Sequence, residues 1–115
     1  MTPKGMELAL RKAKPRGRYW VWLYSVGNPD FGQYAPVSEP ELRWAGTLAA
    51  LRDRFRGYKA ENDLGGGNCP GMIVGEGRTI IGYFSYNERL WEGLPGKWDA
   101  AVRELAIDDA EVVYG

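Results

Sequence analysis

The sequence predicts an α+β fold, with a mostly antiparallel four- to five-stranded sheet and two helices packed largely on one face of it. Three observations lead to this prediction. Residues 18–26 form an apolar run without polar alternation, typical of a strand covered on both faces. Apolar residues at spacings of three and four follow Thr47 and indicate a helix. Three short runs of strand-forming residues, separated by turn residues, then predict a meander.

The N-terminal segment, residues 1–17, is predicted to be a basic, flexible arm in front of one α+β domain over residues 18–115. Residues 1–18 carry six Lys or Arg residues and one acidic residue, whereas the remainder carries nine against fourteen. Residues 6–12 can form a short helical turn, but Pro15 and Gly17 interrupt any continuation. The net charge of zero therefore conceals a basic arm on a mildly acidic body.

The buried strand is followed by a turn, an ambiguous segment and the main helix. Residues 27–30 have turn composition, and residues 31–37 predict a loop or a short edge strand that contains Pro36. The Ser-x-x-Glu pattern of residues 38–41 has the form of a capping box and predicts a short helical turn. Thr47 is the expected N-cap of the main helix. The residues predicted to face the sheet are Leu48, Leu51, Phe55 and Tyr58.

Residues 65–67 are three glycines, and they are expected to end the main helix by adopting left-handed conformations. A second helix is predicted over residues 97–106, where Trp98, Ala101, Val102 and Leu105 share a face. The strands predicted in this half cover residues 72–74, 78–86, 89–92 and 111–114.

Several residue patterns that carry chemistry are absent from the sequence. There is no His, and Cys69 is alone, which removes the commonest general base, a Cys-His pair and a CxxC metal motif. The glycine-rich residues 65–71 follow a helix and precede a strand, the reverse of a phosphate loop. We therefore expect a protein that is not an enzyme, with no catalytic residues, no cofactor and no metal site.

The longest apolar run, residues 19–24, is too short to cross a bilayer, and the N-terminus lacks the apolar stretch of a secretory signal. The sequence therefore predicts a cytoplasmic protein with no membrane contact.

The first functional hypothesis is a small non-enzymatic protein-binding module, such as an adaptor, an inhibitor or an immunity-type accessory protein. The chain is rich in aromatic residues, and aromatic side chains concentrate binding energy at protein interfaces. A protein partner is expected. The candidate partner-binding residues are Tyr34, Trp44, Tyr83 and Trp91.

The second hypothesis is a small nucleic-acid-binding protein, because Lys and Arg side chains neutralise phosphates. Its candidate residues come from the arm and from a basic row on the main helix. They are Lys4, Arg11, Lys12, Lys14, Arg16, Arg18, Arg52, Arg56 and Lys59.

The third hypothesis is an enzyme that uses carboxylate chemistry. Glu88 and Glu92 flank Trp91, and paired acids beside an aromatic platform serve in many glycosidases. A concave pocket that raises the pKa of one of these carboxyls would favour this hypothesis.

Overall fold

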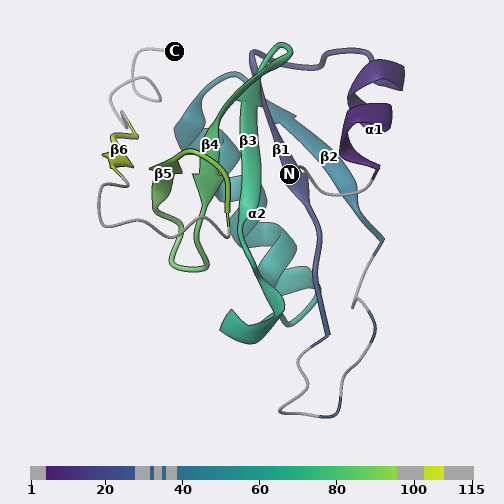
Figure 1. Ribbon diagram of the computed structural model, residues 1–115, viewed down its shortest axis with the longest axis vertical. Helices are drawn as coiled ribbons and strands as arrows, with labels where there is room; N and C mark the ends of the chain where they lie inside the picture. Colours follow the sequence, from purple (N-terminus) through teal and green to yellow (C-terminus); the bar gives the residue numbers. More distant parts are fainter. Residues whose placement is uncertain (1–4, 28–31, 33–34, 36–38, 96–102, 108–115) are drawn as a thin grey trace.

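The computed structural model describes residues 5–27, 32, 35, 39–95 and 103–107. All strands of this part of the chain pair antiparallel in one sheet of order β2-β1-β3-β4-β5-β6 (Figure 1). The α+β class is therefore confirmed, and the described sheet has six strands rather than four or five. The elements are α1 (Met6–Lys12), β1 (Tyr19–Leu23), β2 (Glu41–Ala45), α2 (Leu48–Glu61), the 3-10 helix η2 (Gly66–Asn68), β3 (Met72–Glu76), β4 (Thr79–Phe84), β5 (Leu90–Glu92) and β6 (Glu104–Leu105).

Strand β1 is buried on both faces, as the apolar run predicts. It lies between β2 and β3, and all five of its residues are buried. Because successive side chains of a strand point to opposite faces, Val21 joins the core under α2, whereas Trp20 and Trp22 join a second core cluster on the other face. The sheet therefore separates two apolar clusters, and both need cover.

Helix α2 covers the first face of the sheet. The Thr47 hydroxyl accepts a hydrogen bond from the Ala50 N–H at 3.1 Å, which confirms the predicted N-cap. Leu51, Phe55 and Tyr58 are fully buried, and the Phe55 ring stacks on that of Phe84 with centroids 5.7 Å apart. The predicted apolar stripe of this helix is confirmed.

The end of α2 differs from the expectation in one detail. The residue in the left-handed conformation is Asp63, with φ 52°, and the Leu64 N–H then donates to the Lys59 carbonyl at 3.0 Å. Aspartate tolerates this conformation better than most residues with a side chain. The glycine run therefore does not supply the left-handed cap, and its second and third residues lie in η2 instead.

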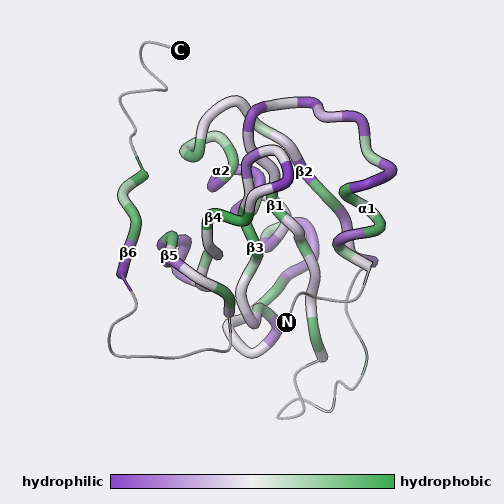
Figure 2. Tube along the Cα trace, turned by 45° about the horizontal axis from the view of Figure 1, so that its top comes forward, coloured by the Kyte–Doolittle hydropathy of each residue, from purple (hydrophilic) through white to green (hydrophobic). Residues whose placement is uncertain are grey.

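Helix α1 covers the opposite face of the sheet, at the end where β1 and β2 lie (Figure 1). Figure 2 shows that this helix carries both hydrophobic and hydrophilic residues. Met6 is buried against Trp20, Trp22 and Ile73, and Leu10 packs against the edge of the same cluster. The two described helices therefore lie on opposite faces of the sheet. The second helix of the one-face prediction, residues 97–106, lies mostly outside the described residues, so the packing of that predicted pair stays a prediction. The two tryptophans of β1 require cover on the second face.

Two further predictions are corrected by strand pairing. The Ser-x-x-Glu pattern does not start a helical turn, because Glu41 begins β2. In β2, Leu42 and Trp44 lie opposite Trp22 and Trp20 of β1, and this pairing outweighs the local capping signal.

The second helix predicted over residues 97–106 is not formed at its C-terminal end. Glu104 and Leu105 form β6, in which Leu105 lies opposite Leu90 and Glu104 opposite Trp91. Residues 97–102 and the strand predicted over residues 111–114 lie outside the described residues, as does most of the segment 31–37.

Met6 tests the docking of α1. Met6→Ala is expected to lower the free energy of unfolding by about 2 kcal/mol, because it removes a buried side chain from the second cluster. Leu8→Ala is the matched control, since Leu8 is 51% exposed and its truncation should cost less than about 0.5 kcal/mol. Urea denaturation measures both. Equal costs would mean that α1 does not pack on the sheet.

The division between an arm and a domain at residue 17 stays a prediction.

No helix in the described ranges has the length and apolar character needed to cross a membrane.

Candidate functional site

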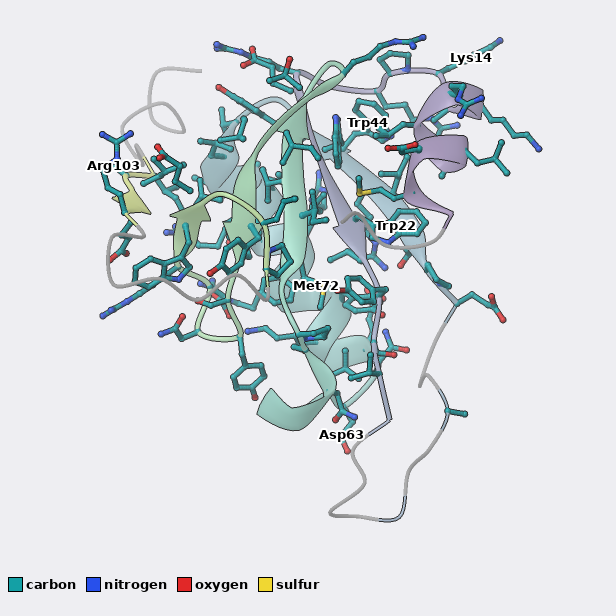
Figure 3. All side chains as sticks on the ribbon, viewed as in Figure 1. Lys14, Trp22, Trp44, Asp63, Met72 and Arg103 are labelled. Carbon is teal, nitrogen blue, oxygen red and sulfur yellow. The ribbon has the colours of Figure 1, made fainter. Side chains whose placement is uncertain are left out.

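A hollow of about 530 Å³ lies between α1 and the turn that joins β3 to β4. Trp44 of β2 lines it together with Leu10 and Arg11 of α1, and Arg78 of the turn lines the other side. Trp44 is half-buried and packs at the edge of the second core cluster. Figure 3 shows Trp44 between α1 and the sheet. We call this feature the Trp44 hollow; Glu7, Ala13, Pro15 and Gly77 complete its lining.

The walls of the Trp44 hollow are held by the second core cluster. Met6 and Leu10, four residues apart on α1, pack on that cluster and fix the helical wall. On the other side, the Trp20 indole N–H donates to the Gly77 carbonyl at 2.6 Å, and Gly77 takes the left-handed conformation that the turn needs, with φ 58°. Trp20 therefore holds the turn that carries Arg78.

The charge around the hollow is mostly positive and is not neutralised within the described chain. Five cations lie on α1, on the segment after it and on the β3–β4 turn, and all five are exposed. None of them forms an ion pair with another described residue, and Glu7 is the acidic residue of the lining. These five cations are Arg11, Lys12, Lys14, Arg16 and Arg78.

Of the predicted partner-binding residues, Tyr83 and Trp91 lie directly opposite each other on β4 and β5. Tyr83 is buried, Trp91 is half-buried, and the Trp91 indole N–H donates to the Ser85 hydroxyl at 3.0 Å. Together with Tyr86 they line a shallower hollow of about 400 Å³. Because β1, β3 and β4 separate β2 from β5, Trp44 belongs to a different surface. Tyr34 lies outside the described residues.

The structure separates the two groups of predicted nucleic-acid contacts. Arg11 and Lys12 belong to α1 on one face of the sheet, whereas Arg52, Arg56 and Lys59 belong to α2 on the opposite face. Arg18 pairs with Glu76 at 2.6 Å. No continuous basic stripe therefore joins the arm to α2 among the described residues. Lys4 lies outside this range.

Two cations of the basic row on α2 are bound by Glu88. The Glu88 carboxylate accepts hydrogen bonds from Arg56 Nη2 and Lys59 Nζ, both at 2.7 Å. Lys59 Nζ also donates to the Tyr86 carbonyl at 2.6 Å and lies 4.6 Å from the ring centroids of Phe55 and Tyr86. These contacts fasten α2 to the β4–β5 turn and leave Lys59 12% exposed.

The charge state of Glu88 gives no support to the enzyme hypothesis. Burial alone would raise the pKa of the Glu88 carboxyl, but hydrogen bonds and positive charge from Arg56 and Lys59 outweigh burial and hold this pKa below its ordinary value. A general acid at neutral pH needs a raised pKa. Glu92 is exposed and pairs with Arg103 at 2.7 Å. The surroundings of Glu88 therefore do not suit a general acid, and Glu92 is paired with Arg103.

Glu88→Gln is expected to lower the free energy of unfolding at pH 7 by about 1.5 kcal/mol, because Lys59 loses a charged partner in a site where Glu88 is 17% exposed. Since the folded-state pKa of Glu88 is depressed, its stabilisation is complete above the unfolded pKa and disappears as the pH falls through the folded pKa. Urea denaturation at pH 7 and at pH 4 measures the difference. Glu61→Gln, in an exposed pair with Arg43, is the matched control and should cost less than about 0.5 kcal/mol. A Glu88→Gln cost that does not decrease at acid pH would contradict this role of the carboxylate.

Cys69 is buried within range of the Lys59 charge. Burial raises the pKa of its thiol, with the Lys59 charge acting in the opposite direction, so the nucleophilic thiolate is disfavoured. The described residues contain no cluster of three or more His, Cys, Asp or Glu side chains that could hold a metal ion.

Sequence reasoning selected Arg11 and Trp44 but missed the other residues of the Trp44 hollow, among them Leu10 and Arg78. Leu10 follows Met6 at helical spacing, and this short pattern could have predicted an amphipathic α1. The sequence predicts a strand from residue 78 onward, but Arg78 lies in the β3–β4 turn. Nothing in the local sequence places this turn beside α1, since the contact depends on the order of strands in the sheet.

Comparisons of the chain with protein-family models, with curated proteins and with solved structures found no match.

Proposed function

We propose that this chain is a small non-enzymatic protein-binding module, of the adaptor, inhibitor or immunity type, and that a segment of its partner docks in the Trp44 hollow. The observation that carries the proposal is the combination in one concave surface of a half-buried tryptophan, an apolar helix residue and unpaired arginines. Tryptophan and arginine are the side chains that most often dominate the binding energy of protein interfaces.

The dimensions of the hollow suit a peptide segment. A volume of about 530 Å³ accommodates one or two side chains of a partner against Trp44 and Leu10. A segment seated there buries less surface than a stable protein complex does, so we expect a dissociation constant of about 10 to 100 μM for an isolated peptide. Further contacts of the whole partner would strengthen this affinity.

Nucleic-acid binding is the alternative, and the exposed arm cations are the observation that favours it. It has less support because two cations of the row on α2 are held by Glu88, and because α2 lies on the face away from the arm. A carboxylate-dependent enzyme, the second alternative, has no supporting observation in the carboxyl pair of Glu88 and Glu92.

Selection from a random twelve-residue peptide display library tests the proposal. The full chain is the target, and the Trp44→Ala variant is used for counter-selection. We expect peptides that bind the natural chain with a dissociation constant below about 100 μM and lose at least tenfold in affinity with Trp44→Ala.

A second variant guards against a loss of folding in Trp44→Ala. Ala13→Gln extends a side chain from the lining of the hollow without removing a core residue, and it should weaken the same peptides. Circular dichroism checks that both variants fold. Failure to recover any peptide that depends on Trp44 would reject the proposed function.

A further inference from the structure

We infer that the Trp44 hollow recognises an acidic peptide segment in which carboxylates flank one apolar anchor residue. The inference rests on the proposed function and specifies the chemistry of the partner.

Cations on the α2 face and at the β5–β6 edge are mostly paired within the chain. Arg43 pairs with Glu41 and Glu61, Arg56 and Lys59 pair with Glu88, and Arg103 pairs with Glu92. The five cations of α1, the segment after it and the β3–β4 turn have no such partners among the described residues. Among the described residues, unpaired positive charge is therefore concentrated on α1, on the segment after it and on the β3–β4 turn, and Arg11 and Arg78 bring it into the lining of the Trp44 hollow. This charge favours the approach of a negatively charged partner.

The two arginines enter the lining of the hollow from different elements. Arg11 projects from α1 and Arg78 from the β3–β4 turn, with Trp44 and Leu10 contributing the apolar lining. A carboxylate on either side of an inserted apolar residue could meet each guanidinium, and guanidinium–carboxylate pairs make two parallel hydrogen bonds. The arrangement therefore fits a segment of acidic, apolar and acidic residues in succession.

The seating of Trp44 favours a peptide over a nucleic acid. The Glu7 carboxylate, which also lines the hollow, repels phosphate and carboxylate oxygens alike, so it does not separate the two kinds of ligand. Trp44 is half-buried against the second core cluster, whereas bases stack on aromatic faces that are open to solvent. The hollow therefore suits a single inserted side chain better than a stack of bases.

The test uses the charge of the peptides selected from the random library and a pair of charge-reversal variants of the full chain. We expect the selected peptides to carry a net negative charge and a central apolar residue. Arg78→Glu should weaken their binding by at least about tenfold. Arg54→Glu makes the same charge change at an exposed position of α2, on the opposite face, and should change binding by less than about twofold.

The possible outcomes separate this inference from the proposed function. Peptides that depend on Trp44 but are neutral or basic, or that are unaffected by Arg78→Glu, would leave the proposed function in place and overturn the inference. Recovery of no Trp44-dependent peptide would overturn both. A fluorescent single-stranded oligonucleotide that displaces the peptides and also loses affinity with Arg78→Glu would overturn the inference in favour of nucleic acid.

Discussion

Trp20→Ala is expected to lower the free energy of unfolding by about 4 kcal/mol. Trp20 is completely buried at the centre of the second core cluster, between β1 and α1. Its truncation leaves a cavity and also removes the hydrogen bond that holds the Gly77 carbonyl. Urea denaturation measures the effect, and a cost below about 2 kcal/mol would contradict the central position of this side chain.

A pair of phenylalanine substitutions isolates the hydrogen bond. Trp20 and Trp22 lie in the same cluster on the same strand, and Nε1 of Trp22 is buried without a hydrogen-bond partner among the described residues. Trp20→Phe should therefore cost about 1 kcal/mol more than Trp22→Phe, because only the former removes a hydrogen bond from the Gly77 carbonyl. Because the Gly77 turn carries Arg78, Trp20→Phe should also weaken peptide binding, whereas Trp22→Phe should not.

Gly82→Ala is expected to cost at least about 3 kcal/mol. A Cβ atom at residue 82 would fall on the backbone carbonyl of Trp91 in β5, far closer than real Cβ atoms approach other atoms. Backbone cannot rotate away as a side chain can, so β5 would have to move, and its pairing with β4 would be lost. The substitution should also separate Trp91 from Tyr83, which a change in tryptophan fluorescence would report.

Gly46→Ala is the matched control for Gly82→Ala. A Cβ atom at residue 46 meets no other atom within 4 Å, and the backbone there is not left-handed. We expect a change within about 0.5 kcal/mol in either direction. If the two glycine substitutions had similar costs, the close approach of β4 and β5 would be wrong.

The parts of the fold that depend on local sequence could be predicted. The apolar run of β1 and the Thr47 cap with the stripe of α2 carry their own signals, because burial pattern and capping act within a few residues. The β3, β4 and β5 meander is equally local, since short turns join its strands. The pairing of these elements confirms the α+β class.

The predictions that were wrong concern residues whose structure depends on contacts with residues far away in the sequence. Trp44 lies in a strand because it pairs with Trp20, and Leu105 lies in a strand because it pairs with Leu90. Neither contact can be read from the local sequence, where a capping motif and a helical spacing of apolar residues predict helix instead. The position of α1 follows from the sheet face that carries Trp20 and Trp22, which only the assembled sheet defines. Tertiary pairing outweighed local propensity at each of these positions.

The candidate site was likewise predictable from the sequence only in part. Trp44 and Arg11 could be selected from the sequence as an aromatic anchor and a basic residue, although each supports a different functional hypothesis there. The structure brings them into one hollow and adds Arg78 from the β3–β4 turn. Their combination, rather than either residue type alone, supports an acidic peptide as the ligand.

The most direct test of a docking site at the Trp44 hollow is a titration of the uniformly ¹⁵N-labelled full chain with the strongest peptide from the selection. The backbone amide and tryptophan indole NMR signals are recorded at each step. We predict that the shifts concentrate on the Trp44 indole, on α1 and on the Gly77–Arg78 turn, and that α2 changes little. Shifts centred on Tyr83 and Trp91, or on the Arg52 and Arg56 side of α2, would contradict the account.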